Sequence, residues 1–192
     1  MHPRRANGSA EPSGSETSAP NLEVDAKTVA RYLDLLVDLL QVRQLAPLHR
    51  NAGKRLVKSP KVYVRDSGIM HALLGIGSMD TLTGHPVVGA SWEGFVIETL
   101  IGAAPDGTVA SFYRTATGVE VDLVLELPGG KVWAIEIKRG LAPRVDKGFY
   151  VACDDIGPDR RLVVYGGSEQ FSLGHDVTAI GLTALTKELS DL

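Results

Sequence analysis

Two neighbouring segments of the sequence carry charged side chains where a strand would otherwise present apolar ones. They span residues 120–125 and 133–138. Side chains alternate between the two faces of a strand, so Asp122 projects from the first segment, and Glu136 and Lys138 project together from the end of the second. Hard cations such as Mg2+ bind carboxylate oxygens, and a lysine can stabilise charge on an attacked phosphate or orient water. This combination predicts metal-assisted hydrolysis of a phosphodiester.

A short turn is expected to bring the two segments together. Residues 127–131 read Leu-Pro-Gly-Gly-Lys, in which proline fixes its own φ and glycine allows positive φ. The strands are then predicted to pair as an antiparallel hairpin, with Asp122 facing Glu136 and Lys138. The alternative is a surface hairpin whose exposed Glu136–Lys138 ion pair is worth about 0–1 kcal/mol. Spacing alone leaves both interpretations open.

Further motifs place this pattern in a family context. Asp122 followed by Glu136-Ile137-Lys138 resembles the Asp…Glu-x-Lys signature of the PD-(D/E)XK nuclease superfamily, with Val121 at the position of the proline in that name. The run from 28 to 138 resembles the C-terminal domain of unknown function of prokaryotic AAA-type ATPases. The motifs that carry this second resemblance occur in order along the chain: Thr28 to Leu33, Lys58 to Tyr63, Asp66 to Gly68, Gly89 with Trp92 to Val96, Tyr113-Arg114, Glu120 to Asp122 and Ile135 to Lys138.

The resemblance implies a restriction-endonuclease-like or Holliday-junction-resolvase-like α/β fold, in which a mixed sheet is flanked by helices. It implies a site that cuts DNA with Mg2+ or Mn2+, in which Asp122 and Glu136 are metal ligands and Lys138 stabilises charge or orients water. A AAA-type ATPase module is the implied partner. However, no Gly-x-x-x-x-Gly-Lys-Ser/Thr phosphate loop occurs in the sequence, and residues 53–55 lack both its first glycine and its hydroxyl residue.

Two alternative functions follow from the same residues. The first is a catalytically inactive DNA-binding or docking tail of a AAA-type ATPase whose ATPase module is not in this sequence. The second is a regulator that binds a metal or a nucleotide without cutting nucleic acid. Because one fold hosts unrelated functions, the activity has to be argued from the site itself.

The superfamily pattern asks for a further acid on the first core helix, and residues 88–102 offer Glu93 and Glu98. At about 100° per residue, Glu93 falls at the edge of the apolar stripe, whereas Glu98 falls on the opposite face. A carboxylate directed toward the core is costly unless it is paired or bound to a metal. We therefore expect Glu93 to be the third acid and metal ligand, and Glu98 to be solvated.

Two other residues are expected beside these acids. Glu120 matches the family and shares a strand face with Asp122, so it is expected to support the metal ligands or to pair with Arg114. In an alternative interpretation, Glu93 is an ordinary acid on the helix flank. It would then pair with Arg114 or Lys138.

Residues 43–65 contain seven basic residues and no acid, although the formal net charge of the chain is -3. Lys and Arg supply most phosphate contacts, which give sequence-independent, salt-sensitive affinity. A nucleic-acid contact is therefore expected here, made chiefly by Arg50, Lys54, Arg55, Lys58 and Lys61. The alternatives are a solvated loop and a surface that docks on an ATPase module.

The remaining sequence predicts three parts. Residues 1–22, rich in Ser, Gly, Ala, Pro and Glu, are expected to be a disordered tail. Residues 23–78 are expected to form a winged-helix-like module with an amphipathic helix capped by Asp25, and residues 79–192 the nuclease-like domain. No apolar run approaches ~18 residues and no signal peptide is evident, so a cytoplasmic protein without a membrane partner is expected. Cys153 is expected to be a small core residue, and the scattered histidines argue against zinc.

Overall fold

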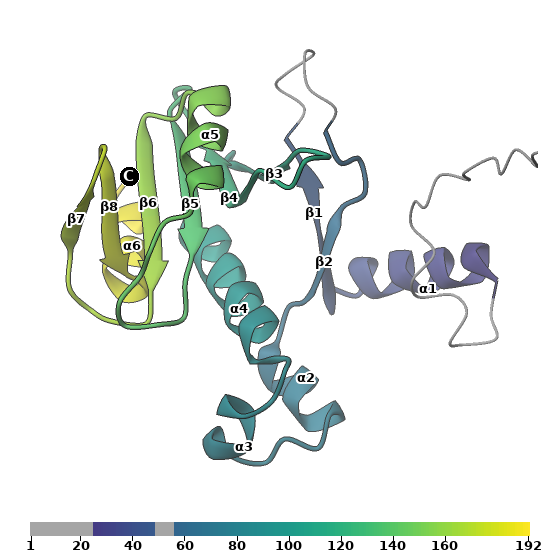
Figure 1. Cartoon of the computed structure of the whole chain (residues 1–192). Helices are drawn as coiled ribbons and strands as arrows, with labels where there is room; N and C mark the ends of the chain where they lie inside the picture. The colour runs from purple at the N-terminus through teal and green to yellow at the C-terminus, as the bar shows by residue number, and fades with distance from the viewer. Residues whose placement is uncertain (1–24, 49–55) are drawn as a thin grey trace, which may run out of the picture.

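Residues 25–48 and 56–192 are described by the computed structural model (Figure 1). They form one eight-stranded mixed sheet in the order β2-β1-β3-β4-β5-β6-β8-β7, flanked by helices. The α/β class expected from the sequence is confirmed, and the tail expected over residues 1–22 lies outside the described residues. The helices are α1 (Ala26–Asp38), α2 (Ser67–Leu73), α3 (Met79–Thr83), α4 (Val88–Ala103), α5 (Lys147–Ile156) and α6 (Leu182–Ser190). The strands are β1 (Val42–Pro47), β2 (Lys61–Val64), β3 (Val109–Arg114), β4 (Glu120–Glu126), β5 (Val132–Ile137), β6 (Arg160–Tyr165), β7 (Phe171–Gly174) and β8 (Val177–Gly181).

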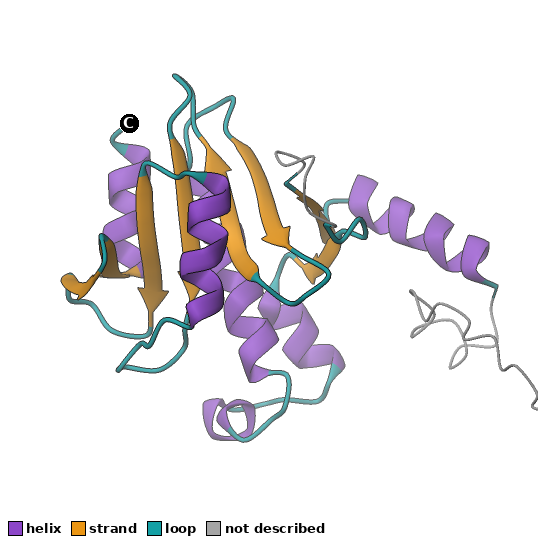
Figure 2. Cartoon of the chain, turned by 45° about the horizontal axis from the view of Figure 1, so that its top comes forward, coloured by secondary structure: helices purple, strands orange, loops and turns teal. Residues whose placement is uncertain are grey.

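Helices cover both faces of the central strands (Figure 2). On one face, α4 and α6 contribute Leu100 and Leu185 to a core that also contains Ile135 of β5. On the other face, α5 packs Phe149 and Cys153 against the sheet. The central strands are apolar on both sides because both of their faces are buried. Cys153 is a fully buried core residue, as expected.

The hairpin of β4 and β5 forms as the sequence predicts. The strands are antiparallel, with Leu123 opposite Ile135 and Glu126 opposite Val132. The connecting turn uses positive φ at Gly129 and Gly130, 83° at each, which residues with a Cβ rarely adopt. This pairing brings the start of β4 beside the end of β5, where the charged side chains lie.

The expected alternation along β4 is interrupted by a β-bulge. Ser111 of β3 is opposite Val124, but Tyr113 is opposite Val121, so β4 contains one residue more than β3 over this stretch. Val121 consequently packs in the core beneath α5, whereas Leu123 packs in the core beneath α4 and α6. Strict alternation along a strand would place these two residues on one face, but the bulge shifts the side-chain order by one. Asp122 lies at this bulge.

The N-terminal hairpin is part of the same sheet. β1 pairs with β2 in antiparallel fashion and with β3 in parallel fashion, with Ala46 opposite Ser111. Leu45 of β1 is 2% exposed and lies in the core beneath α4. The boundary expected between residues 78 and 79 stays a prediction, but strands on its two sides are hydrogen-bonded to each other. Helix α1 begins after Asp25, whose carboxylate accepts a hydrogen bond from the Thr28 amide, as predicted.

No helix within residues 25–48 and 56–192 combines the length and the apolar character that crossing a membrane requires.

Candidate functional site

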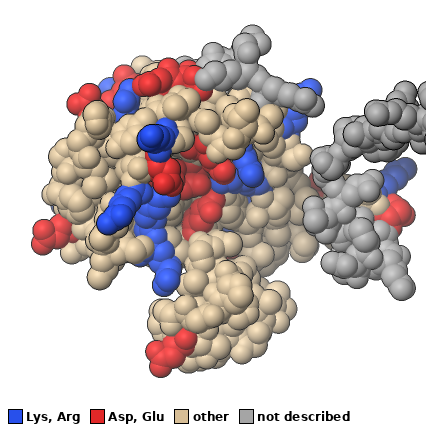
Figure 3. Space-filling view, viewed as in Figure 1, with Lys and Arg blue, Asp and Glu red and all other residues tan. Residues whose placement is uncertain are grey.

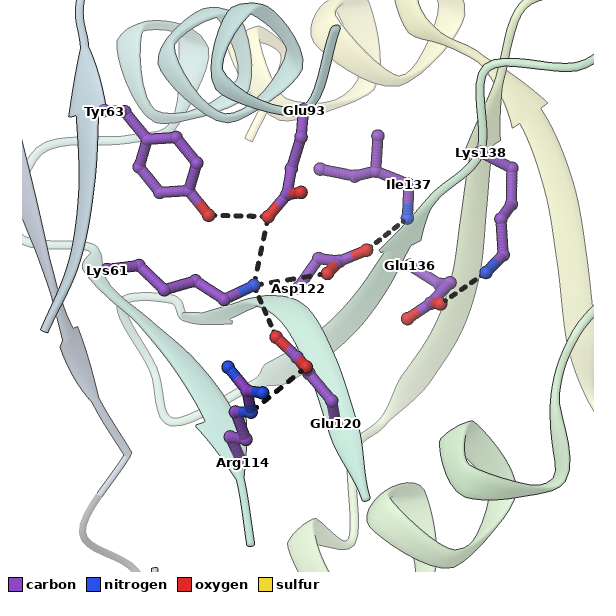
Figure 4. A network of polar contacts seen from close by, with 9 residues as sticks. All are labelled: Lys61, Tyr63, Glu93, Arg114, Glu120, Asp122, Glu136, Ile137 and Lys138. Atoms are coloured by element: carbon purple, nitrogen blue, oxygen red, sulfur yellow. Dashed lines mark hydrogen bonds and ion pairs between the residues drawn. The ribbon is translucent and has the colours of Figure 1, made fainter. Parts of the chain in front are cut away.

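Charged side chains from α4 and β4 meet around Lys61 of β2 (Figure 4). Its Nζ lies 3.0 Å from Oε1 of Glu93 on α4. The same atom lies 2.6 Å from Oε1 of Glu120 and 3.4 Å from Oδ1 of Asp122, both on β4. We call Glu93, Glu120 and Asp122 the carboxylate cluster. Lys61 was expected in a DNA-facing hairpin, but its side chain is 18% exposed and points into this cluster.

Burial and charge act in opposite directions on the Lys61 ammonium. Burial alone lowers the pKa of Lys61, but the charges of Asp122, Glu120 and Glu93 outweigh it and hold the pKa well above its ordinary value. Lys61 is therefore a cation at neutral pH.

Glu93 is held in place by Tyr63 as well as by Lys61. The Tyr63 hydroxyl donates a hydrogen bond to Glu93 Oε1 over 2.6 Å. Tyr63 follows Lys61 by two residues, so both side chains project from the same side of β2. A Cβ at Gly94 would lie 3.3 Å from Cδ1 of Tyr63, so the glycine lets the tyrosine ring lie close against α4. The pairing of Glu93 with Arg114 or Lys138, considered as an alternative, is replaced by these contacts.

The expectation that Glu98 is solvated is wrong. Its side chain is 13% exposed and forms ion pairs with Arg43 of β1 and with Arg65, whose Nε lies 2.8 Å from Glu98 Oε2. The β1–β2 hairpin covers the face of α4 that helical periodicity assigned to solvent. Periodicity distinguishes the faces of a helix, but it does not say whether a second element covers the polar one.

Asp122 connects the two strands of the β4–β5 hairpin. Its Oδ2 accepts a hydrogen bond from the Ile137 amide over 3.0 Å. Burial, followed by the charge of Glu93, raises the pKa of Asp122, while Lys61 and the Ile137 amide oppose the change. The carboxylate is therefore held where its charge is costly and where a further cation would be favourable.

Glu136 and Lys138 form a second pair at the end of β5. Glu136 Oε1 lies 2.9 Å from Lys138 Nζ, and the Glu136 side chain is only 12% exposed, so this is not the exposed ion pair considered as an alternative. Burial, together with the charge of Asp122, raises the pKa of Glu136 to about 7. Burial alone lowers the pKa of Lys138, but Glu136 and Asp146 hold it above its ordinary value. Lys138 is therefore a cation at neutral pH.

The structure brings together most of the residues expected at the site. Arg114 lies beside Glu120, with its Nε 3.5 Å from Glu120 Oε2, as one of the interpretations expected. Figure 3 shows acidic side chains gathered near the middle of this face, with basic side chains on either side. Lys61 was expected as a nucleic-acid contact and not as a partner of the acids, and Tyr63 was missed as a site residue. Both lie in the Lys58 to Tyr63 motif of the family, and their two-residue spacing was the signal that could have placed them on one strand face.

The basic residues expected to contact nucleic acid do not all have the same surroundings. Arg50, Lys54 and Arg55 lie outside the described residues, so their expected contact with nucleic acid stays a prediction. Lys58 is exposed, in keeping with a contact surface. Lys61 contacts the carboxylate cluster instead.

The number of available ligands decides which kind of metal ion the site could hold. Among residues 25–48 and 56–192, no group of three or more His, Cys, Asp or Glu side chains is arranged to hold a metal ion. Mg2+, however, is commonly bound by one or two carboxylates and completed by water and phosphate oxygens. Asp122 and Glu136 lie on adjacent strands, and burial together with the charge of Asp122 raises the pKa of Glu136, so a cation near both is favoured. The donor set fits an ion with two protein carboxylates.

Fold and site together define a mixed α/β domain whose polar centre lies where β4 begins and β5 ends. A family model described as a domain of unknown function (DUF4143) matches residues 88–185, which is just over half of the chain and includes Glu93, Asp122, Glu136 and Lys138. The chain belongs to this family, which is often found at the C-terminus of AAA-type ATPases. A second model, also a domain of unknown function (DUF8612), matches residues 10–80, which include Lys61.

Two curated relatives are similar to most of the chain. They are the uncharacterized proteins Mb2031c of Mycobacterium bovis and Rv2008c of Mycobacterium tuberculosis. Each is 42% identical over 168 residues, which cover 88% of this chain and 37% of the relative. The chain therefore spans little more than a third of the length of these relatives.

Proposed function

We propose that the chain is a metal-dependent nuclease domain of the PD-(D/E)XK type that hydrolyses DNA phosphodiester bonds. The observation that carries this proposal is the hydrogen bond from the Ile137 amide to Asp122, which ties the bulge in β4 to the Glu136-Ile137-Lys138 end of β5. It places a partly buried aspartate beside a Glu-x-Lys motif, at the point where β4 begins and β5 ends. Glu93 of α4 lies near the same point, where it is paired with Lys61.

Each residue has a role in the proposed reaction. Asp122 and Glu136 would hold one Mg2+ or Mn2+, with water and phosphate oxygens completing its coordination. When bound, the ion lowers the pKa of a coordinated water and polarises the phosphate. The ammonium of Lys138 can donate up to three hydrogen bonds and accepts none, so it would stabilise charge on the phosphate or orient the water. Glu136 and Asp146 hold it beside the site, at 2.9 and 3.4 Å.

The remaining acids keep the site in place. Glu93 is the third acid, bound by Tyr63 and Lys61. Glu120 lies between Lys61 and Arg114, so it neutralises two cations beside Asp122. We assign it a supporting role, because a carboxylate already paired with two cations is a poor ligand for a third.

DNA would be held by basic residues of the segment from 43 to 65. Lys58, together with Arg50, Lys54 and Arg55, would contact phosphates and make affinity depend on salt. Changing Lys54 and Arg55 to Ala should weaken binding and reduce the slope of log affinity against log salt by about 2. An unchanged affinity and slope would exclude this contact.

Cleavage of a mixed DNA panel tests the proposed reaction. Linear, nicked, branched and single-stranded DNA would be incubated with Mg2+ or Mn2+ and with wild type, Asp122→Asn or Lys138→Ala. Asp154→Asn is the matched control, because Asp154 lies on α5 with its side chain 73% exposed. We expect wild type and Asp154→Asn to cut and the two site variants to lose at least 100-fold in rate, on the order expected for one catalytic group. Equal cutting by Asp122→Asn would refute the assignment.

A second candidate function is supported by the length of the relatives. Because the chain spans 37% of them, it can act as a DNA-binding or docking tail whose site is not catalytic, serving a AAA-type ATPase module as partner. α1 offers a surface for such docking, since its residues Tyr32 and Leu35 are 64% and 50% exposed. DNA binding without cutting by wild type, on every substrate and with either metal, would favour this function.

A further inference from the structure

The Lys61 ammonium lies at the centre of a group of three carboxylates. Three carboxylate oxygens surround it within 3.4 Å, one each from Glu93, Glu120 and Asp122. Figure 4 shows these groups converging on Nζ from α4 and from β4. Glu136 does not contact this ammonium in the figure, since it faces Lys138.

Lys61 is fixed in this position by its own strand. Tyr63 projects from the same face of β2 and is bonded to Glu93. Just beyond β2, Arg65 pairs with Glu98, one and a half helical turns after Glu93 on α4. The side chain of Lys61 is 18% exposed, and its strand is held to α4 at two points. Lys61 is therefore a fixed part of the site.

We infer that Lys61 takes the place of a second divalent cation between Glu93 and Asp122, so that the site binds one metal ion only. The inference rests on the proposed function, since it assumes that Asp122 and Glu136 take the first ion. Lys61 is a positioning residue: its ammonium holds two acids of like charge together without coordinating water. The attacking water would therefore be activated at the Asp122–Glu136 ion alone.

Removal of the ammonium should open a place for a cation. Without Lys61, Glu93 and Asp122 would be left as partly buried like charges, which is unfavourable unless a cation neutralises them. Their oxygens are hard ligands that suit Mg2+ and Mn2+. The present spacing accommodates an ammonium, and a shorter or uncharged side chain at position 61 would let the acids close on an ion.

The test is the number of Mn2+ ions bound per chain, measured by calorimetry and by electron paramagnetic resonance of free Mn2+, with no DNA present. Lys61→Met keeps most of the side-chain length without its charge, and Lys61→Arg keeps a cation. Lys138→Met is the control, because it removes the lysine of the Glu136–Lys138 pair instead. We expect Lys61→Met to bind one Mn2+ more than wild type, and Lys61→Arg and Lys138→Met to gain none. The same number in Lys61→Met and wild type would overturn the inference.

A second readout covers the case in which Lys61→Met folds poorly without metal. Thermal unfolding would be followed with Mn2+ and with chelator for both proteins. Mn2+ should raise the unfolding temperature of Lys61→Met by more than that of wild type, because the additional ion binds the folded state. An equal shift would count against the inference.

The outcome also separates this inference from the proposed reaction. A gained ion in Lys61→Met, with no DNA cleavage by wild type, would leave the cation position standing and reject the nuclease. Cleavage by wild type, with no gained ion, would reject only the inference.

Discussion

The amide of Ile137 donates a hydrogen bond to the carboxylate of Asp122 over 3.0 Å, and this contact joins β5 to β4 beyond their last backbone pair. That pair is Leu123 with Ile135. The second oxygen of Asp122 faces Lys61 at 3.4 Å. One side chain at a β-bulge thus connects the backbone of the central hairpin to the charged cluster.

Asp122→Asn should retain the fold. The asparagine side-chain oxygen can still accept from the Ile137 amide, and the change removes a charge that burial and Glu93 disfavour. We expect the free energy of unfolding in chelator to stay within about 2 kcal/mol of wild type, since one hydrogen bond to a charged group is at stake. Urea unfolding would measure this. A larger loss would mean that the charge of Asp122 holds the hairpin together, and the lost cleavage of this variant could not then be assigned to the site.

Glu98→Gln should destabilise the attachment of the β1–β2 hairpin to α4. It removes the common partner of Arg43 and Arg65 from a place where the glutamate side chain is 13% exposed. We expect a loss of about 1–3 kcal/mol in the free energy of unfolding, because two partly buried arginines lose their counter-charge. Urea unfolding provides the measurement.

The control for that loss is Glu188→Gln. Glu188 pairs with Arg160 over 2.7 Å, but both side chains are about one third exposed. An exposed pair of this kind contributes about 0–1 kcal/mol. Equal losses in the two variants would show that Glu98 acts as an ordinary surface acid.

The stability of the metal-free protein should depend on Glu136 and pH. The pKa of Glu136 is about 7 in the folded protein, above its ordinary value of 4.5, so the folded state keeps a proton that the unfolded chain releases first. The stability linked to this proton is present below the ordinary value and is lost as pH rises through about 7. Glu136→Gln avoids the loss and should be more stable than wild type by about 1–3 kcal/mol near pH 8.

Urea unfolding in chelator at several pH values would test this dependence. The advantage of Glu136→Gln over wild type should shrink toward pH 4, where the wild-type carboxyl is protonated in both states. Glu169→Gln is the control, because Glu169 is exposed. An advantage that does not change with pH would contradict the assignment to Glu136 ionisation.

Gly166→Ala should be strongly destabilising. A Cβ at Gly166 would lie 2.4 Å from the carbonyl oxygen of Arg139, a backbone atom next to Lys138 that cannot move aside alone. We expect a loss of more than about 2 kcal/mol, typical of a severe local overlap. Gly102→Ala is the control on α4, where nothing lies within 4 Å of the added atom, and it should be neutral or stabilising by up to about 1 kcal/mol. Similar stabilities for both variants would show that the segment after Lys138 adjusts freely.

Local signals predicted the parts of the site that depend on neighbouring residues. The turn at Gly129 and Gly130 specifies the β4–β5 hairpin, because positive φ and a short connection favour antiparallel pairing. The two-residue spacing of Glu136 and Lys138 places them on one side of a strand, where they pair at 2.9 Å. Helical periodicity likewise directed Glu93 rather than Glu98 toward the acids of β4, and the structure brings it to Lys61 beside them.

The sequence by itself thus determined the hairpin, the α/β class and the charged residues where β4 begins and β5 ends. Only the tertiary structure decided that Lys61 lies among the acids, that Glu98 is covered by two arginines, and that β4 bulges at Asp122. Alternation and periodicity describe one strand or one helix, whereas Lys61 and Asp122 are 61 positions apart along the chain. What covers a polar face, and which cation neutralises a buried carboxylate, depends on packing between such distant segments, because burial and charge act through space and not along the sequence.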